Sequence, residues 1–487
     1  MEQPVQLLIV MVAYLILLVL WGLYQGRKVR TDTDYAIAGR NLPGWAAALS
    51  ERATGESSWA LLGLPGFAYA SGLIGVWTAV GCVAGIITAW AAIAWRLRDE
   101  AERYRVKTFT EYIARKHGET GRWIRTVGSL TIVFFFFFYV GAQFLGGGKT
   151  LFTMFHLDPR IGMLITAAVI VPYTVYGGFR SVVYTDVVQA LVMITTLIVG
   201  PIVGVLALKQ RPDVFAHSIT QALHLAGQGY SSLTGAATGF SLGVTIMGGL
   251  SWFFGYLGGQ PQLSMRFMAI KDDRNAKMGR NIGILWTVIA YIGALSIGWI
   301  GIALFGPKGL TDPEYVMPRV MLELFPPTVA GILITGAIAA MISTADSLLI
   351  LSSTELSENI LKSSGDADSR KDLIRSRLAT AALAGIALIV AYLSPSKLIY
   401  TIVGYVWAGI GGTFSIIILL TLFWKKFHGR AVLTTIVTGL LFTVVWISSG
   451  MEKVITARIM TFLVAGIAAV AATFFLSPAA EPNARNG

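Results

Sequence analysis

The sequence consists mostly of long apolar runs that contain almost no charged residues. Many of these runs have about 20 residues, which is the length a helix needs to cross the hydrocarbon core of a bilayer. Only 13% of the 487 residues are charged, roughly half the fraction of an average soluble protein. The runs therefore predict an all-α polytopic membrane protein whose residues 1–487 form one transmembrane domain.

We expect about thirteen transmembrane helices. Basic residues follow the first run instead of preceding it, so we expect this run to be a retained span and not a cleaved signal peptide. The expected spans are 5–24, 43–72, 74–95, 123–151, 159–178, 185–208, 234–260, 281–306, 326–355, 376–393, 397–424, 430–448 and 456–477.

Basic residues are unevenly distributed between the connecting segments. If the N-terminus lies outside, the cytoplasmic segments hold 28 Lys and Arg residues and the outer segments hold 8. Such an excess follows the positive-inside rule. It predicts an outer N-terminus and a cytoplasmic C-terminus in a cell membrane, which we expect to be a bacterial inner membrane. The net charge of +12 is then a topology signal, and nucleic acid is not an expected partner.

The motifs that would indicate an enzyme or a nucleotide-driven pump are missing from the sequence. It contains no G-x-x-x-x-G-K-[ST] motif and no Cys/His cluster, and Cys82 is its single cysteine. The longest polar segments, about 96–122 and 356–375, are too short for a catalytic domain. We therefore expect a secondary transporter or a channel, and no enzyme.

Two of the expected spans are interrupted by polar or glycine-rich stretches. The second contains ERATGESS (51–58), and the seventh contains SWFFGYLGGQP (251–261). Paired interruptions at matching positions indicate a transporter built from inverted repeats. The repeats would be spans 2–6 (43–208) and spans 7–11 (234–424). The alternative is that the glycines only allow close packing of helices.

A stripe of hydroxyl groups occurs in the ninth span. Ala340, Ser343, Thr344 and Ser347 share one helix face, and Asp346 adds a carboxylate. Neutral and anionic oxygens suit a hard cation, so the stripe is a candidate ion site. The alternative is that the hydroxyls only bond to carbonyls of their own helix.

Several ionisable residues lie within or at the ends of apolar runs. Asp186 is either functional or a cap at the start of the sixth span. Arg52 precedes Glu56 by four residues, so the two can pair on a helix. Alternatively, Arg52 binds a carboxylate of the solute. For Glu51 the sequence indicates only a position that faces water.

Several motifs together resemble the sodium:solute symporter family, and within it the members that transport proline. The motifs are DYAIAGRNLPGW (34–45), LS…WALLGLPG (49–66), YGGFRSVVYTDVVQA (176–190), GQPQLSMRFMA (259–269) and AAMISTADSLL (339–349). They cover most of the chain. The resemblance implies a LeuT-type 5+5 inverted repeat with two broken helices, alternating access and sodium-driven uptake of a solute.

The resemblance also implies site residues. A principal sodium site would use backbone carbonyls of the second span and groups of the ninth span: Ala53, Glu56, Ala340, Ser343 and Thr344. A second sodium site would join Asp186, Ser343, Asp346 and Ser347. The solute pocket would contain Ser57, Tyr139, Trp252, Tyr256 and Pro261, and the polar pattern adds Gln143 and Gln260.

This chain departs from the family pattern at two places. Gly55 stands where the proline symporters have an important Asp, and Glu56 is the neighbouring carboxylate that would supply the missing charge. The seventh span also has one extra residue between Trp252 and Pro261. Phe253 and Leu257 are therefore alternative pocket residues.

The expected function is symport of Na⁺ with a small organic solute, for which an amino acid such as proline is the first candidate. The alternative is a proton-coupled or carboxylate-specific symporter that uses Glu56 and Arg52. An uncoupled channel or a sensor is less favoured, because only the short segment SPAAEPNARNG follows the last span. The expected partners are the solute, Na⁺ and the lipid bilayer.

Overall fold

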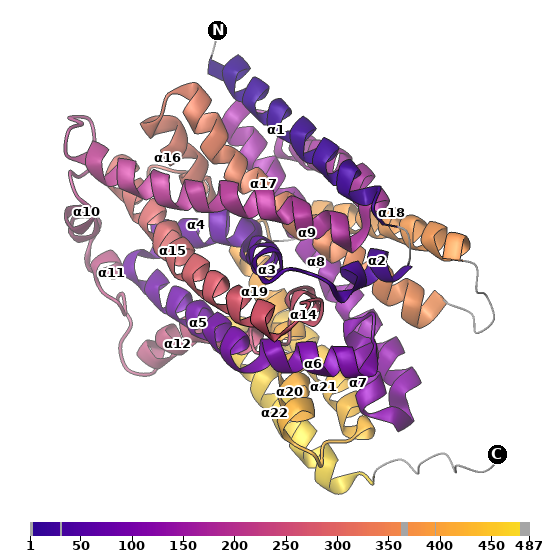
Figure 1. The fold of residues 1–487 in the computed structure, drawn as a ribbon. Coiled ribbons are helices and arrows are strands. Elements are labelled where there is room, and N and C mark those ends of the chain that lie inside the picture. Colours follow the sequence, from indigo (N-terminus) through magenta and orange to yellow (C-terminus); the bar gives the residue numbers. More distant parts are fainter. Residues whose placement is uncertain (1–2, 30–31, 362–368, 395, 478–487) are drawn as a thin grey trace, which may run out of the picture.

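The structure is a computed structural model that describes residues 3–29, 32–361, 369–394 and 396–477. Its helices form a bundle in which α1 lies along one outer edge and the C-terminal helices α21 and α22 lie along the other (Figure 1). Parts of the segments counted for orientation, residues 30–31, 362–368 and 478–487, lie outside the described residues.

The helices follow the apolar runs closely. Their bounds are α1 (Gln3–Gly26), α2 (Asp32–Ile37), α3 (Gly44–Ser58), α4 (Leu64–Ser71), α5 (Gly75–Thr88), α6 (Ala94–Tyr104), α7 (Phe109–Lys116), α8 (Gly121–Phe155), α9 (Pro159–Leu208), α10 (Ile219–Ala226), α11 (Gln228–Ser231), α12 (Phe240–Leu250), α13 (Trp252–Gly255), α14 (Pro261–Met268), α15 (Asp273–Phe305), α16 (Val316–Leu324), α17 (Pro327–Leu356), α18 (Ser369–Leu393), α19 (Ile399–Val406), α20 (Thr413–Phe423), α21 (Gly429–Ser448) and α22 (Ala457–Phe475). Two π-helical turns, η2 (Trp59–Gly63) and η8 (Trp407–Gly412), join α3 to α4 and α19 to α20.

Ten helices in the described ranges are long and apolar enough to cross a membrane. One of them, Gly44–Tyr104, contains two of the expected spans, 43–72 and 74–95. Two other expected spans correspond to the shorter apolar helices Pro159–Pro172 and Phe240–Gly255. The protein is therefore a multi-pass membrane protein, and the number of thirteen spans stays a prediction.

The helix α17 lies at the centre of the bundle, where it packs against α3, α8 and α9. It is buried along nearly its whole length, as expected for a helix that is apolar all round. The outer helices instead expose large apolar side chains, such as Leu17 on α1, Leu393 on α18 and Ile467 on α22. Exposed apolar side chains of this kind suit contact with lipid.

Two helices break at the positions that the sequence indicates. In α3, Ser57 has non-helical dihedral angles (φ 50°, ψ −167°), an uncommon conformation for a residue other than glycine. The second break lies between α12 and α14, where the short α13 is followed by Gly258 with φ 79°. A residue with a Cβ atom would be strained at Gly258. Both breaks expose backbone polar groups inside the bundle.

The segment α9 consists of two helical parts that meet at Gly178 (φ 62°), where the backbone is not helical. Thr166 lies beside Ile338 and Thr196 donates to the Leu333 carbonyl, so both parts lie along the same stretch of α17. One unbroken helix would hold Thr166 and Thr196 about 45 Å apart, so the chain reverses direction at Gly178, as expected for spans 159–178 and 185–208. The Cβ position of Gly178 would lie 2.4 Å from the Tyr35 ring, so a side chain does not fit there. The motif YGGFR therefore forms a tight turn.

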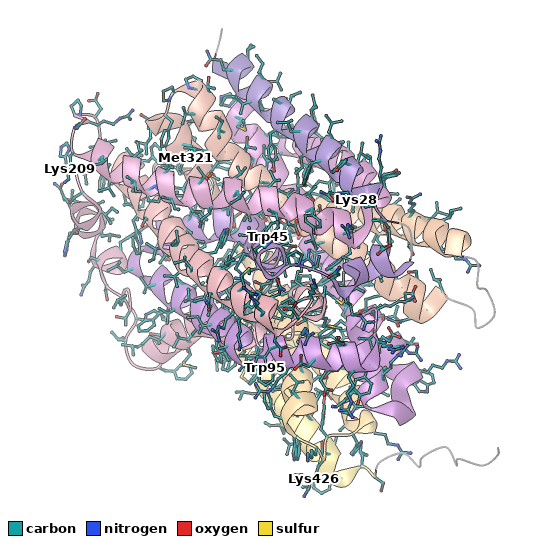
Figure 2. All side chains as sticks on the ribbon, in the orientation of Figure 1. Lys28, Trp45, Trp95, Lys209, Met321 and Lys426 are labelled. Atoms are coloured by element: carbon teal, nitrogen blue, oxygen red, sulfur yellow. The ribbon has the colours of Figure 1, made fainter. Side chains whose placement is uncertain are left out.

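The orientation of the bundle in the membrane stays a prediction. The sequence assigns Lys28 and Lys426 to the cytoplasmic side and Lys209 to the outside. In Figure 2, Lys209 lies toward one end of the bundle, whereas Lys28 and Lys426 lie toward the other.

Candidate sodium and solute site

The broken helix α3 and the central helix α17 meet through oxygen atoms. The Ser343 hydroxyl lies 3.0 Å from the carbonyl oxygen of Ala53 and 3.0 Å from that of Ala340. The Thr344 hydroxyl donates to the Thr54 carbonyl at 3.1 Å. Hydroxyl groups can rotate to present lone pairs, so this junction can offer several neutral oxygens to a hard cation. The hydroxyls thus reach across to α3 instead of bonding only to their own helix.

Glu56 supplies a further backbone carbonyl next to the break. That carbonyl accepts a hydrogen bond from the Trp59 N–H group, and the Ser57 hydroxyl accepts a second bond from the same N–H group at 3.1 Å. The break at Ser57 thus begins directly after Glu56. Of the five residues predicted for the principal sodium site, four contribute to the α3–α17 junction: Ala53, Ala340, Ser343 and Thr344.

Arg52 is buried in a cluster with two carboxylates. Its Nη1 atom lies 2.8 Å from Glu56 Oε1 and its Nε atom 2.5 Å from Glu51 Oε2, and a second bond joins Nη2 to Glu51 Oε1. The Trp90 indole donates to Glu51 Oε2 at 3.1 Å. All three charged side chains are at most 1% exposed. The expectation that Glu51 faces water is wrong, because Glu51 is the bidentate partner of Arg52.

A second buried arginine, Arg266 on α14, lies at the predicted second sodium site. Its Nη2 atom lies 3.1 Å from Asp186 Oδ2 and 2.5 Å from the Ser347 hydroxyl. Ser50 and Thr54 on α3 also donate to Asp186 Oδ2, at 2.6 and 3.3 Å. A guanidinium group thus already supplies positive charge among these oxygens.

The sequence does not reveal this role of Arg266, because the residue follows an apolar run and resembles one of the basic residues of a cytoplasmic loop. Asp186 lies eight residues after the turn at Gly178, inside the second helical part of α9, and bonds to side chains of other helices, so it is not a helix cap. Asp346 is also fully buried, on α17. The structure therefore brings Asp186 and Ser347 together, and Arg266 joins them.

Polar groups of α8 contact the break in α3. The Tyr139 hydroxyl donates to the Ser57 hydroxyl at 3.2 Å. The Ser58 N–H group donates to the side-chain oxygen of Gln143 at 3.1 Å. These bonds hold the non-helical turn in place, and they bring three of the predicted pocket residues (Ser57, Tyr139 and Gln143) to one region.

Aromatic side chains from several helices surround the same break. The Trp59 and Trp252 rings stack with centroids 4.4 Å apart and an interplanar angle of 8°. The Trp407 ring contacts those of Tyr139 and Tyr256 at 5.7 and 5.3 Å. The Tyr256 and Tyr291 hydroxyls are 3.1 Å apart. We call Trp59, Tyr139, Trp252, Tyr256, Tyr291 and Trp407 the aromatic cluster.

The structure places Trp252 and Tyr256 in this cluster, and not Phe253, which is only partly buried and contacts the Phe254 ring. Leu257 is buried. Sequence reasoning missed Trp59, Tyr291 and Trp407. The signal that could have found Trp59 and Trp407 is their position at a helix break or beside the glycine-rich stretch Gly409–Gly412. Tyr291 lies in an ordinary apolar span, so no local signal marks it.

Gln260 and Pro261 form the start of α14. Pro261 is the first residue of that helix, where its missing N–H group costs nothing. The Gln260 side-chain oxygen accepts a bond from Gln262 Nε2 at 3.0 Å. Within the described part of the chain, Gln260 Nε2 has no hydrogen-bond partner. It is therefore a buried donor that remains open to a ligand.

An ion cluster that joins α8 to the turn Pro313–Tyr315 lies next to the aromatic cluster. Lys149 Nζ lies 2.6 Å from Glu314 Oε2, and the same carboxylate accepts the N–H groups of Ile399 and Tyr400 at 3.0 Å each. Burial raises the pKa of the Glu314 carboxyl, whereas Lys149 acts to lower it. Because the Tyr400 ring contacts those of Trp59 and Trp252 at 6.1 and 5.5 Å, this ion cluster supports one side of the aromatic cluster.

The fold and the site together define a class of protein. Two broken helices lie beside a central helix that carries hydroxyl groups, all within a multi-pass bundle, and this is the arrangement of a secondary transporter. A sequence profile of the sodium:solute symporter family matches residues 35–439. The chain belongs to the sodium:solute symporter family, whose members are transporters and not enzymes.

Relatives with known names cover almost the whole chain. The osmoregulated proline transporter OpuE of Bacillus subtilis is 31% identical over 93% of this chain and 90% of its own length. The high-affinity proline transporter PutP of the same organism is 31% identical over 94% and 95%. Sodium/proline symporter 2 of Staphylococcus saprophyticus is 30% identical over 91% and 86%.

Two solved structures share the fold. A Na⁺-coupled sialic acid symporter in a substrate-bound outward-open state matches with a TM-score of 0.78 and 19% identity, over 97% of this chain and 98% of the other. MHP1, a nucleobase-cation-symport-1 family transporter in a closed conformation, matches with a TM-score of 0.56 and 12% identity, over 90% and 92%. At these identities the likeness concerns the fold alone.

Proposed function

We propose that the protein couples the entry of Na⁺ to the uptake of proline, or of a closely similar amino acid, by alternating access. The observation that carries the coupling is the α3–α17 junction, where the Ser343 and Thr344 hydroxyls meet α3 carbonyls at 3.0 and 3.1 Å. Three relatives with about 30% identity are named for proline, which supports the choice of solute.

In this proposal the principal sodium site consists of the carbonyls of Ala53 and Glu56, the carbonyl of Ala340 and the hydroxyls of Ser343 and Thr344. The second sodium site, with Asp186, Ser343, Asp346 and Ser347, stays a prediction. A sodium ion there requires Arg266 to withdraw from Asp186 and Ser347, because its Nη2 atom lies within 3.1 Å of both.

The proposed solute site lies between the two helix breaks. It contains Ser57, Tyr139, Gln143, Trp252, Tyr256, Gln260 and Pro261, together with Trp59 from the aromatic cluster. Its donors and acceptors, such as the unpartnered Gln260 Nε2, would fix the orientation of a small polar solute.

We further propose thirteen spans, with inverted repeats at 43–208 and 234–424, an outer N-terminus and a cytoplasmic C-terminus in a bacterial inner membrane. The paired breaks, in α3 and between α12 and α14, support the repeats. The uneven distribution of basic residues supports the orientation.

Of the two alternative functions, the carboxylate-specific symporter loses support and the proton-coupled symporter keeps it. A carboxylate-specific site at Arg52 is disfavoured, because Glu51, Glu56 and Thr287 already engage its guanidinium group. Proton coupling keeps one supporting observation, since Glu56 and Asp346 are both fully buried carboxyl groups. The two kinds of coupling differ in whether solute binding needs Na⁺.

A thermal-shift screen of the purified protein tests the proposal. Amino acids, carboxylates and sugars are added with Na⁺ or with K⁺, because a ligand that binds the folded state raises its melting temperature. We expect proline to stabilise the protein only with Na⁺, and Ser343→Ala and Thr344→Ala to weaken that effect. A proline shift that is equal in K⁺ contradicts sodium coupling, and no shift with any amino acid removes the proposed solute.

A further inference from the structure

The cluster around Arg52 contains more negative than positive charge. One guanidinium group lies between two carboxylates, Glu51 and Glu56. Glu51 receives two of its hydrogen bonds and a third from the Trp90 indole. Glu56 receives a single bond from Arg52 through Oε1, at 2.8 Å. Glu51 therefore compensates the arginine, and Glu56 retains most of the excess charge.

The second oxygen of Glu56 is open to a ligand. The side chain is 0% exposed, and in the described part of the protein Oε2 accepts no hydrogen bond of ordinary geometry. The Tyr291 side chain is close enough for a weak hydrogen bond to the Glu56 carboxylate, and its hydroxyl also contacts the Tyr256 hydroxyl at 3.1 Å. Buried carboxylate oxygens are normally paired or hydrogen-bonded. A buried carboxylate oxygen without a well-formed hydrogen bond, next to a helix break, thus favours a further donor that arrives from outside the protein.

The surroundings of Glu56 suit a cationic nitrogen. Tyr256 and Tyr291 lie near its carboxylate, and Trp59, which lies 6.1 Å from Tyr291, stacks on Trp252. Aromatic faces attract cations through their quadrupole. A carboxylate at the edge of an aromatic cluster is therefore a binding site for a protonated amine.

The proposed sodium ion is not the cation that Glu56 needs. Ser343 and Thr344 reach α3 from α17, whereas the Arg52–Glu56 pair contacts Thr287 and Tyr291 of α15. Arg52 and Glu56 share one face of α3, and this face contacts α15. The Ala53 carbonyl of α3 instead contacts the Ser343 hydroxyl of α17. Glu56 thus contributes only its backbone carbonyl to the proposed sodium site, and its carboxylate forms a second candidate position for a cation on the α15 side of α3.

We propose that Glu56 Oε2 binds the protonated amine of the solute and so restricts the protein to solutes that carry a cationic nitrogen with at least one N–H group. This inference rests on the proposed function for the place of the solute and deepens it by naming the group that is recognised. Neutral sugars and carboxylates without an amine can donate only from neutral hydroxyl groups, so they leave the buried charge uncompensated.

Matched pairs of ligands test the inference on the purified full-length protein. Proline is compared with tetrahydrofuran-2-carboxylate, in which a ring oxygen replaces the protonated nitrogen. Alanine is compared with lactate, and glycine with glycolate. With saturating Na⁺, we expect at least one amine to bind roughly 10- to 100-fold more tightly than its oxygen counterpart, as a charge-assisted hydrogen bond predicts. If no amine is preferred, the inference is overturned.

The variant Glu56→Gln assigns the preference to this residue. This variant should bind the amine more weakly. Within each pair, the ratio of the affinity for the amine to that for its oxygen counterpart should fall to about threefold or less. Glu355→Gln is the matched control, because Glu355 is also buried but both of its oxygens bond to other groups, such as Thr110 and Asn359. It lies twelve residues beyond Ser343 on α17, about 18 Å along the helix. An unchanged ratio in Glu56→Gln contradicts the inference.

Two further measurements distinguish a failure of this inference from a failure of the proposed function. Stabilisation of Glu56→Gln by Na⁺ alone shows that the variant is folded, since Ser343 and Thr344 are intact. If that variant does not fold, Glu56→Asp, which withdraws the carboxylate by one methylene group, should reduce the ratio and leave Na⁺ binding in place, and an unreduced ratio overturns the inference. Amine preference without any need for Na⁺ contradicts the sodium coupling and leaves the role of Glu56 standing.

Discussion

Two buried arginines in this bundle, Arg52 and Arg266, differ in the number of carboxylates that they contact. Arg266 contacts one carboxylate, Asp186, and otherwise bonds to hydroxyl and carbonyl oxygens. Arg52 lies between two carboxylates and leaves one oxygen of Glu56 unpartnered among the described residues. Arg266 and Asp186 therefore form a one-to-one pair, whereas the Arg52 cluster has one carboxylate in excess. We therefore expect the Arg52 cluster to be the one that binds a charged solute.

The largest effect on stability is expected from replacing Arg52, the cation that lies between two carboxylates. Arg52→Met leaves two buried carboxylates without a partner, and one such loss costs about 3–5 kcal/mol. We therefore expect the free energy of unfolding to fall by more than about 5 kcal/mol, measured by denaturation in detergent micelles. Arg52→Lys, which keeps the charge, should lose less. A stable Arg52→Met protein would contradict the charge balance described here.

Removing Arg266 should cost less, because a single carboxylate is stranded. We expect Arg266→Met to lower the free energy of unfolding by about 3–5 kcal/mol. The double variant Asp186→Asn/Arg266→Met should recover a large part of that loss, since no buried charge remains. If the double variant is as unstable as the sum of the single variants, Asp186 and Arg266 do not act as a pair.

The hydroxyl stripe should affect Na⁺ affinity more than stability. Ser343→Ala and Thr344→Ala each remove one oxygen at the α3–α17 junction, and a loss of about 1.4 kcal/mol corresponds to a tenfold weaker affinity. We expect about that change in the Na⁺ concentration that gives half of the thermal shift. Ser353→Ala is the control, because this buried hydroxyl lies ten residues beyond Ser343 on α17 and donates to the Ile350 carbonyl of its own helix. Equal effects in all three variants would contradict the assignment.

The smallest effect is expected at His117. This buried group stays neutral and therefore needs no charged partner. Burial, with smaller contributions from Lys116 and His428, lowers the pKa of His117, outside the membrane-spanning helices, from 6.5 to about 4. Below pH 6.5 the unfolded chain takes up a proton that the folded protein does not, so stability falls with pH. Between pH 7 and 5.5 the loss is about 1 kcal/mol.

The variant His117→Gln should lack this component of the pH dependence. The measurement is the difference between wild type and variant in unfolding free energy at several pH values, so that other titrating groups cancel. A difference that is constant between pH 7 and 5.5 would show that His117 binds its proton equally in both states.

Much of the fold follows from the sequence because apolar length and glycine content are local properties. The expected span 326–355 corresponds to α17 (Pro327–Leu356), and both breaks occur within the polar stretches that predict them. The turn at Gly178 between the two parts of α9 was predictable as well, because the motif YGGFR interrupts the apolar run. The close contact of Gly178 with the Tyr35 ring was not predictable, because Tyr35 lies far away in sequence.

The residues of the candidate site were predictable where they share one face of a helix. Ser343, Thr344 and Ser347 share a face by spacing alone, and all three contact α3. The partners of the charged residues were not predictable in the same way. Arg266 and Tyr291 reach the site only through tertiary packing, and the position of Glu51 depends on which side of α3 faces Trp90.

The most direct test of the account is uptake of labelled proline into proteoliposomes that contain the purified protein. An inward Na⁺ gradient is imposed at constant pH and compared with K⁺ on both sides under an inward proton gradient. We predict transient accumulation of proline with the Na⁺ gradient and none with the proton gradient. Accumulation that persists without Na⁺ and follows the proton gradient would contradict the central claim.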